Sequence, residues 1–113
     1  MLNIAVFVSG RGSNLKSLNE SVVKEKIRIC AVVSDKENCE AVGYAIDNQI
    51  PVFLVSEKDS NKFFSYNKLL DQFKKIKIDL IVLAGYLKKI PDNIIDEYEN
   101  RIINIHPALL PKF

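Results

Sequence analysis

Residues 2–15 read LNIAVFVSGRGSNL and contain the pattern from which the architecture follows. Residues 2–8 form an almost unbroken apolar run with several large or β-branched side chains, which predicts a buried strand. The glycines and small polar residues that follow predict a tight turn. Leu15, Leu18 and Val22 then recur at helical spacing, so a helix is expected directly after the turn. A buried strand, a tight turn and a helix form the repeating unit of an α/β protein.

The rest of the chain repeats this alternation. Further strands are predicted at residues 27–33, 51–55, 78–83 and 101–105, each followed or preceded by an amphipathic helical segment. Strand–helix alternation of this kind favours a Rossmann-like, mostly parallel sheet with right-handed crossovers and helices on both faces. One helix is expected to begin after an N-cap at Asn38 and to carry the apolar face Ala41, Val42, Ala45 and Ile46. The next is expected to begin after an N-cap at Asp59 or Ser60 and to carry the stripe Phe63, Tyr66, Leu70 and Phe73. A short helix is expected to begin at Pro91 and to contain Ile94, Ile95 and Tyr98.

Composition narrows the class of protein. With 113 residues, 48% of them hydrophobic, the chain is expected to form a single domain over residues 1–113. A net charge of +2, from 16 basic and 14 acidic residues, gives no reason to expect a nucleic acid partner. No apolar stretch is long enough for a membrane span and no signal peptide is apparent, so we expect a cytoplasmic protein. Cys30 and Cys39 with one histidine predict neither a disulfide framework nor a metal site.

The turn after the first strand has the features of a phosphate-binding loop. Residues 9–14 read SGRGSN and would place backbone N–H groups at the start of a helix, where anions bind. Gly10 and Gly12 supply the first two glycines of the dinucleotide motif, but Leu15 occupies the place of the third. A single phosphate monoester therefore fits better than a pyrophosphate. The alternative is that the loop is only a tight strand-to-helix turn.

The other conspicuous polar residues stand at the far end of the chain. Side chains in a strand alternate between faces, so Asn104 and His106 are expected on the same side, just before Pro107 ends the strand. The alternative is that this histidine only caps a loop. Polar segments also follow the other strands, at residues 34–35 and 85–89. Because parallel strands end at one edge of the sheet, we expect all these segments to converge on one site.

Three segments together carry a family resemblance. Residues 9–15 (SGRGSNL), 83–87 (LAGYL) and 104–112 (NIHPALLPK) resemble the phosphoribosylglycinamide formyltransferases, over all 113 residues but only over the amino-terminal part of the family's domain. The asparagine–x–histidine–proline segment is shared with other formyltransferases, whereas the serine–glycine loop is typical of the phosphoribosylglycinamide enzymes. The resemblance implies transfer of a formyl group from 10-formyltetrahydrofolate, as co-substrate, to 5-phosphoribosylglycinamide in purine biosynthesis.

The same resemblance implies roles for individual residues. Asn104 and His106 would be catalytic, the first as a hydrogen-bond donor to the developing oxyanion and the second as a general acid. Asn104 would also touch the folate. The residues implied to hold the substrate phosphate and ribose are Gly12, Ser13, Asn14, Leu15 and Lys16, and those implied to bind the folate are Lys62, Leu87, Lys88, Lys89 and Ile90.

One part of the family's site has no match among these residues. In the family an aspartate from a later segment supports the histidine, and a nearby carboxylate would raise the histidine's pKa. We therefore expect weak or no activity from this chain alone. We also expect it to form a homo-oligomer or to require a partner segment that completes the site. The alternatives are a catalytically incomplete fragment that binds phosphoribosyl ligands and a related enzyme that uses formyltetrahydrofolate.

Overall fold

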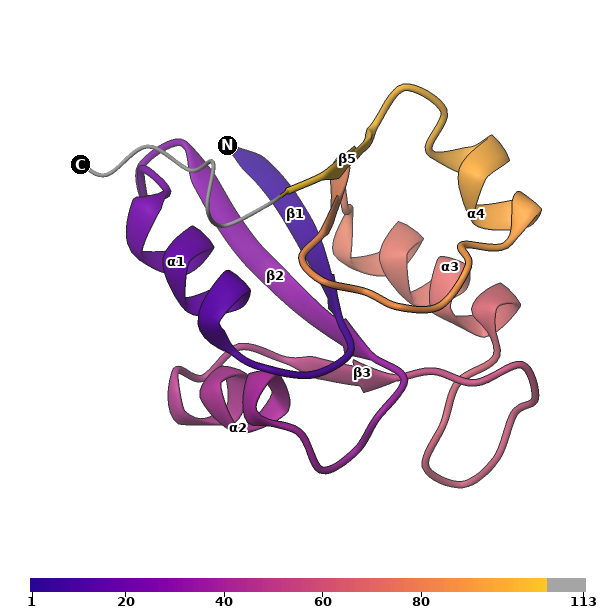
Figure 1. The fold of residues 1–113 in the computed structure, drawn as a ribbon. Coiled ribbons are helices and arrows are strands. Elements are labelled where there is room, and N and C mark those ends of the chain that lie inside the picture. Colours follow the sequence, from indigo (N-terminus) through magenta and orange to yellow (C-terminus); the bar gives the residue numbers. More distant parts are fainter. Residues whose placement is uncertain (106–113) are drawn as a thin grey trace.

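The computed structural model describes residues 1–105, and the predicted α/β class is confirmed. Figure 1 shows a sheet with two groups of helices, one on either side. All strand pairings are parallel, and the strand order is β3-β2-β1-β4-β5. The strands are β1 (Leu2–Val8), β2 (Ile27–Ser34), β3 (Val52–Leu54), β4 (Leu80–Leu83) and β5 (Ile102–Asn104), and the helices are α1 (Ser13–Ser21), α2 (Glu40–Asp47), α3 (Tyr66–Ile76) and α4 (Asp92–Glu97).

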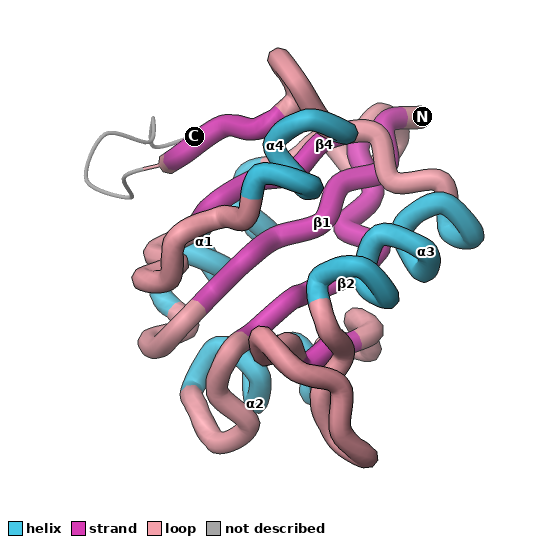
Figure 2. The backbone as a smooth tube through the Cα atoms, turned by 90° about the vertical axis from the view of Figure 1, so that its right-hand side faces the viewer, coloured by secondary structure: helices cyan, strands magenta, loops and turns pink. Residues whose placement is uncertain are grey.

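The central strand β1 divides the hydrophobic core into two layers. Its alternating side chains send Ala5 and Phe7 toward α3 and α4, and Ile4, Val6 and Val8 toward α1 and α2. All five are buried, which explains why the strand reads as a nearly continuous apolar run. Figure 2 shows the strands between the two groups of helices.

The strand order places a topological switch point beside β1. From β1 the chain first moves outward through β2 to β3, and then returns to the other side of β1 to add β4 and β5. In open α/β sheets the crevice beyond the carboxyl ends of the strands at such a point is where ligands bind. A ligand site is therefore expected at the segments that follow β1 and β4.

Two predicted helix starts are wrong. The N-cap of α2 is Cys39 rather than Asn38. The N-cap of α3 is Ser65, whose side chain accepts a hydrogen bond from the Lys68 N–H, rather than Asp59 or Ser60. Asp59 instead accepts from the Ser65 N–H, and Ser60 accepts from the Phe63 N–H. Asp and Ser stabilise turns by the same hydrogen bonds with which they cap helices, so the sequence alone does not separate the two roles.

The remaining boundaries differ from the prediction by one or two residues, as is usual at element ends. Both cysteines are free thiols. Among residues 1–105, none of the helices is long and apolar enough to cross a membrane.

Candidate functional site

The loop between β1 and α1 passes close over the beginning of α2. The Gly10 carbonyl oxygen accepts a hydrogen bond of 3.0 Å from the Ala41 N–H. A Cβ atom on Gly12 would lie 3.2 Å from the Glu40 carbonyl oxygen, a tight contact with backbone. Glycine at position 12 therefore favours the close approach, and backbone contacts hold the loop against the start of α2.

The start of α1 carries the features expected of an anion-binding site. Gly12 is the N-cap, no side chain caps the helix, and the first turn contains no acidic residue. The helical ladder begins with the Lys16 N–H, which donates to the Gly12 carbonyl oxygen at 2.8 Å. The preceding N–H groups of the first turn have no acceptor within the helix, so they are available to an anion. The exposed Ser13 and the half-buried Asn14 add polar side chains beside them, whereas Leu15 points into the core.

The segment after β4 lies against this loop. Gly85 has a positive φ of 79°, and the Asn14 side-chain nitrogen lies only 3.0 Å from the position that a Cβ on Gly85 would take. The Leu87 N–H donates a hydrogen bond of 2.9 Å to the Ser9 hydroxyl, which in turn donates to Asp35 Oδ1 at 2.8 Å. The structure therefore brings together the segments that follow β1, β2 and β4, as the sequence predicts.

A pocket of about 820 Å³ opens beside these segments. Its lining includes Lys88 and Lys89 from the segment after β4, Asp35 from the segment after β2, and Tyr66 from the start of α3. Leu87 projects outward with 77% of its surface exposed, while Ile90 packs against the core beneath α3 and α4. The full lining is Asp35, Val55, Ser56, Glu57, Tyr66, Lys88, Lys89, Pro91 and Asp92.

Two tyrosines fix the floor of this region. The Tyr66 and Tyr86 hydroxyls share a hydrogen bond of 2.7 Å, which ties the beginning of α3 to the segment after β4. The Tyr86 ring meets Phe7 edge-on, with the ring centroids 5.2 Å apart. Burial raises the pKa of both phenols above their ordinary value, most strongly that of Tyr86.

These raised pKa values predict a loss of stability in alkali. Above pH 10 the tyrosines of the unfolded chain ionise while Tyr66 and Tyr86 in the folded chain keep their protons, so the free energy of unfolding falls as the pH rises. At pH 8 the free energy of unfolding of Tyr86→Phe should be about 1 kcal/mol below that of the native chain, because one hydrogen bond is missing. Between pH 8 and pH 11, however, the free energy of unfolding should fall less in Tyr86→Phe than in the native chain. Urea unfolding at both pH values measures this, and parallel losses in the two proteins would contradict it.

Asn104 reaches the same edge of the sheet on β5. It is the register partner of Leu83 at the end of β4, its side chain is exposed, and the following Ile105 N–H donates to the Leu83 carbonyl oxygen at 3.0 Å. His106 lies outside the described residues. Its predicted placement beside Asn104 and near Gly12 therefore stays a prediction.

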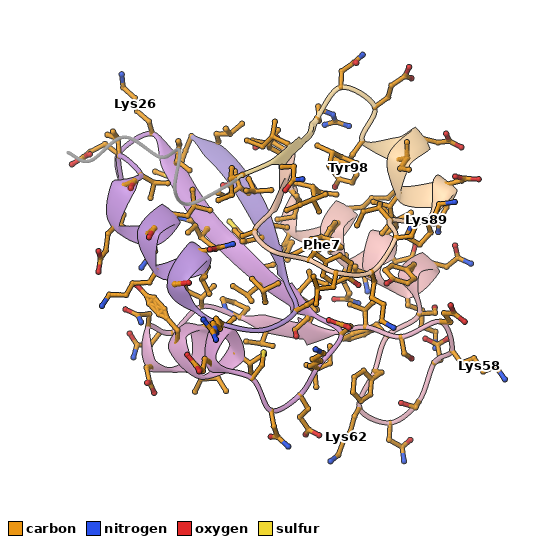
Figure 3. All side chains as sticks on the ribbon, in the orientation of Figure 1. Phe7, Lys26, Lys58, Lys62, Lys89 and Tyr98 are labelled. Atoms are coloured by element: carbon orange, nitrogen blue, oxygen red, sulfur yellow. The ribbon has the colours of Figure 1, made fainter. Side chains whose placement is uncertain are left out.

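Lys62 is not brought into this group. Its ammonium lies 3.3 Å from a Glu37 carboxylate oxygen, in an exposed ion pair between the segments that follow β3 and β2. Figure 3 shows Lys62 and Lys89 well apart, on different parts of the molecule. The folate role that the family resemblance implies for Lys62 stays a prediction.

Two residues of the site had no predicted role. The sequence pattern assigns Ser9 only to the glycine loop and Asp35 only to the polar segment after the second strand. The available signal was a serine that directly continues a buried strand, because a buried hydroxyl needs hydrogen-bond partners. Among residues 1–105, no group of three or more histidine, cysteine, aspartate or glutamate side chains could hold a metal ion.

Comparison with known proteins agrees with this architecture. The sequence model of the formyl transferase family matches residues 2–113. The chain belongs to this family. A chloroplastic phosphoribosylglycinamide formyltransferase of Vigna unguiculata is 43% identical over 113 residues, which cover 97% of this chain and 36% of the relative. Phosphoribosylglycinamide formyltransferase of Bacillus subtilis is 35% identical over 116 residues, which cover 100% of this chain and 60% of the relative. This formyl transferase chain thus spans between about a third and three fifths of the length of these two curated relatives.

Solved structures show the same fold. Glycinamide ribonucleotide transformylase 1 from Geobacillus kaustophilus superposes with a TM-score of 0.81 at 30% identity, over 99% of this chain and 63% of that one. A formyltetrahydrofolate deformylase from Pseudomonas putida, at 22% identity and a TM-score of 0.73, shares the fold. The Rossmann-like formyltransferase sheet predicted from the sequence is therefore confirmed.

Proposed function

We propose that residues 1–113 form the amino-terminal part of a domain that transfers a formyl group from 10-formyltetrahydrofolate to 5-phosphoribosylglycinamide. The observation that carries the proposal is the contact between two loops at the switch point. Ser9 and Asn14, beside the predicted phosphate site, touch Leu87 and Gly85, in the segment predicted to bind the folate. Two ligands bound by these loops would meet at the carboxyl ends of β1 and β4, as a transfer between them requires.

In this proposal the start of α1 holds the phosphoribosyl group. The N–H groups of Ser13, Asn14 and Leu15, the Asn14 amide and the Lys16 ammonium supply donors and positive charge, and Gly12 lets the loop approach α2. The folate would lie along residues 87–90, where Lys88 and Lys89 line the pocket of about 820 Å³. The near-neutral charge of the chain agrees with small-molecule substrates.

The proposed reaction gives roles to Asn104 and His106. The glycinamide amine attacks the formyl carbon, its new C–N bond replaces the bond to N10 of the folate, and the proton lost by the amine ends on N10. Negative charge builds on the formyl oxygen in between. The exposed amide of Asn104, at the end of β5, can donate a hydrogen bond to that oxygen, and His106 is proposed as the acid that hands the proton to N10.

Ligand binding tests this proposal directly. Isothermal titration calorimetry should show that the chain binds phosphoribosylglycinamide, and that removing the 5-phosphate from the ligand weakens binding. Asn14→Ala should raise the dissociation constant for phosphoribosylglycinamide about tenfold, because hydrogen bonds to a charged group contribute about 1.5–3 kcal/mol. Asn19→Ala is the matched control, since Asn19 lies on the same helix but donates to the Tyr44 hydroxyl.

A turnover assay with 10-formyltetrahydrofolate separates the two versions of the function. Formylation at a measurable rate supports an enzyme. Binding of phosphoribosylglycinamide without turnover supports the ligand-binding fragment, and equal binding of the phosphorylated and dephosphorylated ligands would contradict both. Self-association and a completing partner segment stay predictions; β5 is an edge strand of the described sheet and its Ile103 is 47% exposed.

A further inference from the structure

Ser9 is a buried hydroxyl with both of its hydrogen-bonding functions in use. It continues the apolar strand β1 and has no exposed surface. Its Oγ donates to Asp35 Oδ1 at 2.8 Å and accepts from the Leu87 N–H at 2.9 Å. A hydroxyl placed in a core costs stability unless it is paired, and here the pairing joins three loops that are far apart in the sequence.

The hydrogen bond to Leu87 holds the middle of a segment whose two ends, Tyr86 and Ile90, pack against the core. The Leu87 side chain is 77% exposed, and Lys88 and Lys89 after it are exposed as well. Between those ends the backbone is attached at Leu87 N, through Ser9, to the end of β1. The position of Lys88 and Lys89 in the pocket wall therefore depends on the Ser9 hydroxyl as well as on the two packed ends.

Asp35 sets the direction of that hydroxyl. Because a carboxylate only accepts hydrogen bonds, the Ser9 O–H must point at Asp35, which leaves an oxygen lone pair facing the Leu87 N–H. Without an acceptor at position 35, the hydroxyl is free to rotate and to present its hydrogen to the same N–H. Asp35 thus acts on the Leu87 N–H through the Ser9 hydroxyl.

We propose that Ser9 and Asp35 are positioning residues, which hold the Leu87 N–H and so fix residues 87–90 in the conformation that binds the folate. This inference rests on the proposed function, because it assigns a substrate to that segment. It also predicts that different contacts position the two substrate-binding segments. The Ser9–Asp35 pair serves the folate side, whereas the phosphate side is held separately by the hydrogen bond from Ala41 to Gly10 and by the helix start at Gly12.

The test compares the affinities for the two substrates. Ser9→Ala should raise the dissociation constant for 10-formyltetrahydrofolate about tenfold and that for phosphoribosylglycinamide less than threefold, since one hydrogen bond is lost on the folate side only. Asp35→Leu should weaken folate binding in the same sense. Asp35→Asn should restore it, because an amide oxygen can still accept from Ser9.

The matched control is Tyr98→Phe. Tyr98 is also buried and its hydroxyl is also paired, but it donates to the Ile78 carbonyl oxygen at 3.1 Å, beside the amino-terminal end of β4 rather than the carboxyl ends of the strands. Tyr98→Phe should therefore leave the ratio of the two affinities unchanged, even where it lowers stability.

A second measurement reports on the positioning without any ligand. Hydrogen exchange of the Leu87 amide, followed by NMR, should be at least about tenfold faster in Ser9→Ala and Asp35→Leu than in the native chain or in Asp35→Asn. If Ser9→Ala does not fold, the two Asp35 variants carry the same comparison.

The outcomes separate this inference from the function on which it rests. A native chain that binds neither substrate overturns the proposed function, and the folate role of the pair with it. A native chain that binds both, with equal losses for the two ligands in Ser9→Ala or no restoration in Asp35→Asn, overturns the positioning role alone. A selective loss of folate affinity, with faster exchange at Leu87, supports it.

Discussion

Phe7→Ala is expected to destabilise the chain by about 3–5 kcal/mol, since truncating a buried phenylalanine removes its transfer free energy and leaves a cavity. Phe7 lies in the central strand and has no exposed surface. Its ring meets Phe73 of α3 and Tyr86 after β4 edge-on, with centroids 6.1 and 5.2 Å away. The substitution therefore removes the ring around which α3 and the floor of the site are packed.

Urea unfolding, read as a shift of the midpoint at constant slope, measures this loss. Ile46→Ala is the matched control, because it removes a large apolar side chain that is 62% exposed on α2 and replaces it with a better helix former. Its free energy of unfolding should stay within about 0.5 kcal/mol of that of the native chain. If Phe7→Ala unfolds at the same urea concentration as Ile46→Ala, this account of the core is wrong.

The fold was predictable because hydrophobic periodicity and local turn chemistry agree along most of the chain. The apolar run of residues 2–8 could only be satisfied as a strand covered on both faces, and the glycine turn after it leads directly into α1. Helix starts were less predictable. Asp59, Ser60 and Ser65 all have side chains that can cap a helix, and tertiary contacts decide which of them does.

The site was predictable only as a convergence of loops. Parallel strands imply that the segments after β1, β2 and β4 meet at one edge, and they do. Which atoms meet there is set by side-chain directions that no sequence spacing encodes, so the hydrogen bonds that join Ser9 to Asp35 and Leu87 are seen only in the structure. The folate role of Lys62 came from the family resemblance rather than from the residue pattern. Its ammonium pairs with Glu37, apart from Lys89, and its role stays a prediction.

Gly85→Ala is expected to damage both stability and phosphate binding. The backbone of Gly85 has a φ of 79°, where a residue with a Cβ costs about 1–2 kcal/mol. The new methyl group would also lie 3.0 Å from the Asn14 side-chain nitrogen and would have to displace it. Together these effects predict a loss of about 2–3 kcal/mol in the free energy of unfolding. They also predict a dissociation constant for phosphoribosylglycinamide at least about tenfold higher, because the displaced amide no longer reaches the phosphate site.

The same substitution at Gly43 provides the contrast. Gly43 lies within α2, and a Cβ added there meets no atom within 4 Å. Alanine lowers the entropy of the unfolded chain and favours the helix, so Gly43→Ala should raise the free energy of unfolding by about 0.5–1 kcal/mol and leave ligand affinity unchanged. Thermal unfolding with and without phosphoribosylglycinamide measures both quantities in each variant. Because the chemical change is identical, a loss of phosphoribosylglycinamide affinity in Gly85→Ala but not in Gly43→Ala would support the dependence of the Asn14 side chain on the space beside Gly85. Equal affinities in the two variants would contradict it.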